Sequence, residues 1–131
     1  MTTEQFETYL IKIGGLVNGY YSDRPPIVKN LCECDDGWLQ MIVDLIEELI
    51  AAGWDKHICQ IKEKFGGLRF YIGSGSDEIW EIISKYESLS YEICETCGEQ
   101  GELRKDCGWK GSSWLKTMCD KHYLELKAER K

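Results

Sequence analysis

Two short pairs of metal-binding residues near the C-terminus constrain the fold of this chain more than any other feature. Cys94 and Cys97 are separated by two residues, and Cys119 and His122 repeat the same spacing. A gap of two residues lets both side chains of a pair reach one ion, and two such pairs complete a tetrahedral Cys3His set. Protein atoms fill all four positions, so the pattern predicts one structural Zn²⁺ ion and not a catalytic one.

The segment that carries these pairs, residues 91–131, is expected to be a finger that the ion holds together. Such a segment is too short to bury a core of its own. A cysteine knuckle, a hairpin and a second ligand pair at the start of a helix resemble the treble-clef and zinc-ribbon class. Cys107 lies inside the finger and could replace one of the four ligands.

The remaining cysteines leave several alternatives open. Cys32 and Cys34, together with His57, could form a second metal site, or they could be reduced structural thiols. His57 and Cys59 could act as a base and a nucleophile, although neighbours on one face of a strand more often only pack together. Seven cysteines is an odd number for a disulfide framework. In a chain without an export signal, metal ligands and buried thiols are expected instead.

Length and charge narrow the class of protein. A chain of 131 residues and 15.2 kDa holds one ordinary domain, or one small domain with a metal-held appendage. No apolar run approaches the roughly 20 residues that span a bilayer, and the first residues lack the pattern of a signal peptide. We therefore expect a soluble, cytoplasmic protein that does not bind membranes. The net charge of −7 disfavours a general nucleic-acid binder.

Hydrophobic periodicity predicts an α+β fold, with helices packed on a small antiparallel β-hairpin or sheet. The expected elements are a helix over 2–13, a loop over 18–30, a helix over 35–52, a β-hairpin over 57–72 and a helix over 76–89. The hairpin is expected to turn at Gly66 and Gly67, with strict alternation along its first strand. Residues 1–90 would form the α+β body, and the finger over 91–131 would pack with it as one unit.

The stretch 61–71, with the sequence IKEKFGGLRFY, is the most distinctive part of the body. Basic and aromatic side chains alternate along it, so they can project from one face of the hairpin and bind a phosphate and a base. Aromatic and basic residues of the finger could join them. The predicted ligand-binding residues are Lys62, Lys64, Arg69, Tyr71, Trp109, Lys110 and Trp114. The alternative is a sheet with one solvated polar face. The glycine- and serine-rich run over 73–76 is a further possible anion cradle.

Five motifs in this order carry a resemblance to a known group. They are CDDGW over 34–38, IKEKFGGLRFY over 61–71, ICETCG over 93–98, GW over 108–109 and TMCDKH over 117–122. Together they resemble small uncharacterised proteins that bacteriophages and prophages encode, over roughly residues 30–123. The resemblance implies a viral protein that acts in the cytoplasm of a bacterial host. It supplies no catalytic residues.

The preferred function at this point is that of a non-enzymatic counter-defence protein, which sequesters a nucleotide-like signalling ligand. No nucleophile or open metal position is paired with a base, so an enzyme is not expected. One alternative is an inhibitor or adaptor that docks on a host defence protein through acidic residues. These are Glu33, Asp35, Asp36, Asp44, Glu47 and Glu48. Another is a nucleic-acid accessory protein that uses the basic and aromatic residues of the finger. These are Arg104, Lys105, Lys110 and Lys116 with Trp109 and Trp114. A homo-oligomer stays open.

Overall fold

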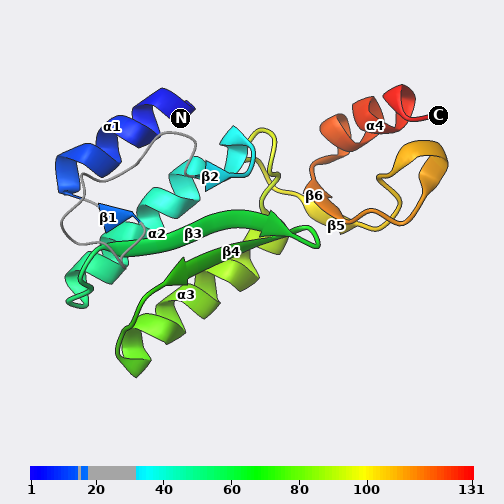
Figure 1. Cartoon of the computed structure of the whole chain (residues 1–131). Helices are drawn as coiled ribbons and strands as arrows, with labels where there is room; N and C mark the ends of the chain where they lie inside the picture. Colours follow the sequence, from blue (N-terminus) through cyan, green and yellow to red (C-terminus); the bar gives the residue numbers. More distant parts are fainter. Residues whose placement is uncertain (15, 18–31) are drawn as a thin grey trace.

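The structure is a computed structural model that describes residues 1–14, 16–17 and 32–131. The predicted loop over 18–30 lies outside the described residues. Within the described part, helices and two small sheets form the predicted α+β fold. Figure 1 shows the body at one end and the finger beyond the tip of the hairpin formed by β3 (His57–Lys64) and β4 (Gly67–Ile72). None of the helices described is long and apolar enough to cross a membrane.

Three of the described helices each begin at a residue whose side chain accepts a backbone N–H of the first turn. Helix α1 (Thr3–Ile13) starts with the predicted capping box between Thr2 and Gln5. Helix α2 (Leu39–Ala51) starts later than predicted, because residues 36–38 form a 3₁₀ turn before it. Ser76 caps helix α3 (Asp77–Leu89) through the backbone N–H of Ile79. Helix α4 (Asp120–Glu129) is capped by Cys119 and carries His122 in its first turn, so the second ligand pair lies at the start of this helix.

The larger sheet is mixed, whereas the sequence predicted an antiparallel one. Strands β3 (His57–Lys64) and β4 (Gly67–Ile72) form the predicted antiparallel hairpin. Strands β1 (Leu16–Val17) and β2 (Cys32–Glu33) both pair with β3 in parallel, one after the other. In the finger, β5 (Glu102–Arg104) and β6 (Lys116–Met118) form a separate antiparallel sheet.

The hairpin turns one residue earlier than predicted. Lys64 pairs with Gly67, so the two turn residues are Phe65 and Gly66, with φ of 54° and 85°. These positive φ values are those of the tight turns whose twist matches the two strands. Gly67 is instead the first residue of β4. A Cβ atom there would lie 2.4 Å from atoms of the Tyr91 ring, so glycine is needed for close packing.

The predicted strict alternation along β3 is wrong at one point. The pairing of β3 with β4 shifts between Ile58 and Gln60, which is a β-bulge at Cys59. As a result, Ile58 and Ile61 both face the core and are fully buried. The bulge changes which side chains lie on the outer face of the first half of the strand.

The core lies between the larger sheet and helices α1, α2 and α3. Helix α2 contributes more of its buried residues than any other element, and α3 packs against both α2 and β4. Burial of each large apolar side chain contributes about 1.5–3 kcal/mol. The largest fully buried side chains are Trp38, Phe6, Phe70, Leu10, Leu39, Ile42, Leu45, Ile46, Leu49, Ile58, Ile61 and Leu68.

Hydrogen bonds connect the finger to the body at several points. The Thr117 hydroxyl, on β6, donates to the carbonyl oxygen of Gly66 at 2.6 Å. The indole N–H of Trp38 donates to the carbonyl oxygen of Ile93 at 2.8 Å. The backbone N–H of Gly37 donates to the carbonyl oxygen of Glu95 at 2.8 Å. The bond from Thr117 holds the hairpin turn against the finger, and the division of the chain at residue 90 stays a prediction.

Candidate metal centre and ligand groove

The structure brings the four predicted metal ligands together. One ligand atom from each of Cys94, Cys97, Cys119 and His122 lies within 4.8 Å of all the others. The knuckle before β5 supplies the first pair, and the start of α4 supplies the second. This is a Cys3His group that could hold one metal ion.

The spacing of the ligand atoms fits a tetrahedral ion. Zn–S bonds of about 2.3 Å and Zn–N bonds of about 2.0 Å would place two sulfurs about 3.8 Å apart, and a sulfur and a nitrogen about 3.5 Å apart. Cys97 Sγ lies 3.8 Å from Cys119 Sγ. His122 Nδ1 lies 3.8 Å from Cys94 Sγ and 3.2 Å from Cys119 Sγ. These three distances are close to those expected around one tetrahedral metal ion.

Backbone groups around Cys94 favour the thiolate that a metal requires. Burial raises the pKa of the Cys94 thiol. Backbone hydrogen bonds, those at Cys119 and Cys97 foremost, oppose burial and lower the pKa to about 7. At the second pair, the N–H of His122 donates to Cys119 Sγ at 3.5 Å. The sulfurs thus receive hydrogen bonds of the kind that knuckle loops provide.

Cys107 lies outside this group. Its side chain is buried beside Cys94 and Met118 in the small apolar cluster of the finger. Burial raises the pKa of the Cys107 thiol, which favours the neutral form. Cys107 is therefore a packing residue in this structure, and the four ligands remain those that the spacing predicted.

The second metal site is not formed among the described residues. Cys32 Sγ and Cys34 Sγ lie 2.7 Å apart, but no third His, Cys, Asp or Glu ligand completes a group with them in the part of the chain that the structure describes. His57 Nδ1 lies 3.5 Å from Asp55 Oδ2. The two cysteines are therefore a close pair of thiols, half-buried at the end of β2.

The basic and aromatic residues of the hairpin share one face of the sheet. Lys62 pairs with Arg69 and Gln60 pairs with Tyr71, and residues paired across antiparallel strands point to the same side. Lys62 Nζ lies 5.8 Å from the centre of the Tyr71 ring. The hairpin therefore presents Lys62, Lys64, Arg69 and Tyr71 away from the core, as the motif suggested.

Arg69 differs from its neighbours because the fold already occupies its guanidinium group. Nη1 donates to the carbonyl oxygen of Leu68 at 2.8 Å, and Nη2 donates to the Tyr91 hydroxyl at 3.2 Å. The bond to Tyr91 raises the pKa of Arg69 further. Arg69 thus connects β4 to the segment that leads into the finger.

A groove lies where the hairpin turn meets the finger. Its volume is about 510 Å³, and its lining is mostly apolar. The lining residues are Glu63, Phe65, Ser113, Trp114 and Leu115. Phe65 and Trp114 are 66% and 57% exposed, so two large aromatic side chains face solvent beside an apolar hollow. Lys64 Nζ lies 5.6 Å from the centre of the Phe65 ring.

Of the residues that line this groove, the sequence predicts Trp114 and misses Glu63, Phe65, Ser113 and Leu115. The alternating pattern places Phe65 in a strand, although its position before two glycines is a signal for a turn. The carboxylate of Glu63 accepts the N–H of Gly66 at 2.7 Å and so supports the turn from within the groove.

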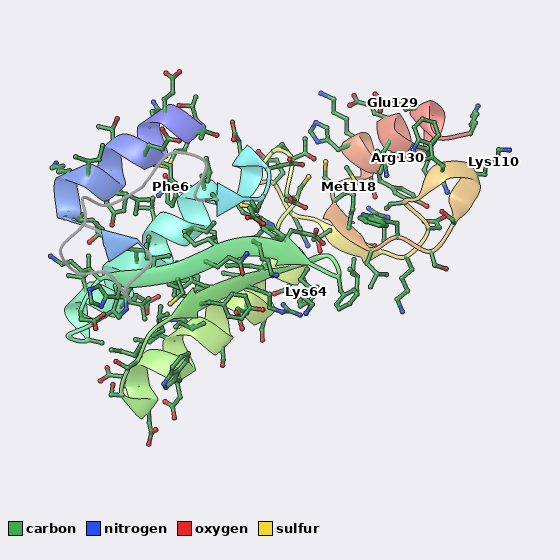
Figure 2. The ribbon with its side chains drawn as sticks, in the orientation of Figure 1. Phe6, Lys64, Lys110, Met118, Glu129 and Arg130 are labelled. Atoms are coloured by element: carbon green, nitrogen blue, oxygen red, sulfur yellow. The ribbon has the colours of Figure 1, made fainter. Side chains whose placement is uncertain are left out.

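The other two finger residues of the predicted ligand set lie elsewhere. Figure 2 shows Lys64 at the tip of the hairpin and Lys110 at the outer end of the finger. The N–H of Lys110 donates to the carbonyl oxygen of Arg130 at 2.7 Å, and the Arg130 guanidinium lies 6.0 Å from the Trp109 ring. Trp109 and Lys110 therefore pack on the C-terminal end of the chain, and Trp114 is the finger residue that reaches the hairpin.

No protein-family model, curated protein or solved structure matches this chain. The resemblance to phage proteins therefore stays a prediction.

Proposed function

We propose that this protein is a non-enzymatic binding protein that captures a nucleotide-like ligand at the groove between the hairpin turn and the finger. One structural Zn²⁺ ion, held by the Cys3His group, keeps the finger in place. The observation that carries the proposal is the position of Phe65, an exposed aromatic residue in a left-handed turn position beside a second exposed aromatic residue.

Zinc is the metal that this donor set favours. Three thiolates and one imidazole in a closed tetrahedron are typical of structural zinc sites. The finger buries only a small apolar cluster of its own, made of Cys94, Cys107 and Met118. A segment with so small a core needs an ion for its stability.

Phe65 breaks a local rule without a gain in packing. Turns of this type favour Asn or Asp before Gly, because their side chains tolerate positive φ. A bulky residue at φ of 54° costs about 1–3 kcal/mol. The residue is 66% exposed, so burial offsets only part of this cost. Such a residue is expected where a ligand, and not the fold, requires it.

The neighbours of Phe65 suit a ligand with a planar base and a negative charge. Phe65 and Trp114 offer two aromatic surfaces for stacking, which is sequence-tolerant and strong for nucleobases. Lys64, adjacent in sequence, supplies a cation for phosphate, and Lys62 lies farther along the same face. Capture requires complementarity to the ground state of the ligand and no acid–base machinery.

Some of the residues that each alternative function requires already form hydrogen bonds or ion pairs within the protein. Glu47 accepts the Tyr9 hydroxyl, and Glu48 accepts Lys85, so the acidic face of α2 is partly engaged. In the finger, Arg104 is paired with Asp120, and Lys116 lies 3.6 Å from Glu95. We therefore favour ligand capture over the two alternatives, the acidic protein inhibitor and the nucleic-acid accessory protein. The counter-defence role and the cytoplasm of a bacterial host belong to this proposal through the resemblance to phage proteins.

Calorimetric titration with cyclic dinucleotides and cyclic ADP-ribose isomers tests the proposal. The informative variant is Phe65→Asn, because asparagine suits the turn and should keep or raise the thermal stability. Loss of one stacking surface should weaken binding by about 5-fold to 150-fold, since stacking contributes about 1–3 kcal/mol per base. Trp109→Ala is the matched control, because it removes an exposed aromatic residue outside the groove.

Three results would contradict the proposal: no heat with any nucleotide, equal affinity of wild type and Phe65→Asn, or conversion of the ligand. Chromatography of the ligand after incubation detects conversion. Native mass spectrometry of the same sample counts the metal ions and identifies their mass.

A further inference from the structure

The two thiols at the end of β2 form a separate feature that ligand capture does not use. Cys32 Sγ and Cys34 Sγ lie 2.7 Å apart, and both side chains are half-buried. Cys32 is the first residue of β2, and Cys34 lies in the bend directly after the strand, where the chain brings the two sulfurs together. Neither cysteine belongs to the Cys3His group.

We propose that Cys32 and Cys34 are an oxidation site, which a low-molecular-weight disulfide converts into an intramolecular disulfide. Disulfide exchange depends on access of one thiolate to the attacked sulfur and on a second thiol close enough to resolve the mixed disulfide. The sulfur–sulfur contact supplies the second condition before the reaction begins. Proximity of this kind replaces a collision between two molecules by a step within one molecule.

The environment of the pair assigns different roles to the two cysteines. The hydrogen bond with Cys32 raises the pKa of the Cys34 thiol, and burial raises it further, so within this close pair the proton is held more strongly at Cys34. Cys32 is therefore the attacking sulfur, and Cys34 is the resolving thiol.

The reaction is balanced in two exchange steps. The Cys32 sulfur, having lost its proton, attacks the small disulfide, forms a mixed disulfide and releases one small thiolate. Cys34 then loses its proton, attacks the Cys32 sulfur and releases the second small thiolate. The two protons end on the two released thiols, and two electrons pass from the protein to the small disulfide, which is reduced.

The other cysteines of the chain have different surroundings from those of Cys32 and Cys34. Four cysteine or histidine positions are committed to the metal group, and Cys107 is buried in the finger. Cys59, at the bulge of β3, is half-buried as well and is the natural control.

The test uses the full chain with its metal bound, equilibrated with oxidised and reduced glutathione, acid-quenched and alkylated. Peptide mapping should find Cys32 and Cys34 linked and protected from alkylation, with loss of two hydrogen atoms and unchanged metal content. Reduction with dithiothreitol should restore both thiols. The Cys34→Ser variant should stop at a glutathione adduct on Cys32, and Cys59→Ser should behave like wild type.

Two results would overturn the proposal. One is full alkylation of both cysteines in wild type after equilibration with excess glutathione disulfide. The other is any different pairing, whether through Cys59 or through a metal ligand. Because wild type alone decides between these outcomes, the test does not depend on whether a variant folds.

Discussion

Glu48 shows how one side chain can connect two helices of the body. It lies on α2, and its carboxylate accepts hydrogen bonds from Lys85 Nζ at 2.8 Å and from the Tyr86 hydroxyl, both on α3. The bond from Lys85, followed by that from Tyr86, lowers the pKa of Glu48. Burial and the same carboxylate raise the pKa of Tyr86 to about 12. The contact therefore favours an ionised Glu48 beside a neutral Tyr86.

We predict that Glu48→Gln destabilises the protein at neutral pH and that the difference from wild type shrinks in acid. A carboxyl whose pKa is lower in the folded than in the unfolded state stabilises the fold above its unfolded pKa of about 4.3. This stabilisation is lost as the pH falls through the folded pKa. Urea unfolding of both proteins at neutral pH and near pH 3 measures the effect.

Glu81→Gln, an exposed position on α3, is the control and should change stability little at either pH. A destabilisation by Glu48→Gln that is equal at both pH values would show that packing, and not the charge, is responsible.

At the scale of elements, the cysteine knuckle supports the start of α2. The N–H of Gly37 donates to the carbonyl oxygen of Glu95 at 2.8 Å, and the N–H of Asp35 donates to Glu95 Oε2 at 3.0 Å. The backbones approach so closely that a Cβ at Gly37 would lie 2.4 Å from the carbonyl oxygens of Cys94 and Glu95. The cysteine knuckle and the 3₁₀ turn before α2 are therefore packed closely together.

We predict that Gly37→Ala destabilises the protein by about 1–3 kcal/mol or more, because the added methyl group meets backbone atoms that cannot move aside easily. The matched control is Gly73→Ala, where a Cβ would meet nothing within 4 Å. Chemical unfolding measures both variants. Equal stability of the two would contradict the close contact between the knuckle and the start of α2.

Elements with a strong local signal were predictable from the sequence, and those without one were not. The capping box at Thr2 and the ligand spacing after Cys94 depend on neighbours only, so both were predicted correctly. Strands β1 and β2 have two residues each, too few to show a period. The bulge at Cys59 and the turn at Phe65 shift the register by one residue, which an apolar pattern cannot reveal.

The groove was not predictable for a different reason. Its walls are Phe65 from the hairpin and Trp114 from the finger, and the bond between Thr117 and Gly66 brings these segments together. No local pattern in either segment encodes that contact. The sequence therefore indicated the kinds of residue that could bind a ligand but not which of them meet.

At the scale of the whole molecule, we predict that removing the metal with a chelator unfolds the finger while the core around α2 persists. The finger has a small apolar cluster of its own, whereas α2 is surrounded by the main core. Hydrogen exchange read by mass spectrometry should show lost protection over residues 94–129 and retained protection in α2. A C-terminal third that is unchanged after complete removal of the metal would contradict this.

Two cysteine variants provide the matched comparison. Cys119→Ser removes a ligand and should reproduce the effect of the chelator. Cys107→Ser changes a buried thiol of the same segment and should keep one bound ion.

The bond from Thr117 to the carbonyl oxygen of Gly66 has one more consequence. Because of this bond, the groove has one wall from the hairpin turn and one wall from the finger. The finger is the segment that would fold around an ion. On the proposed function, the supply of metal in the cell would then set the fraction of molecules able to retain their ligand. Zinc starvation would then abolish ligand binding while the concentration of the protein stayed constant.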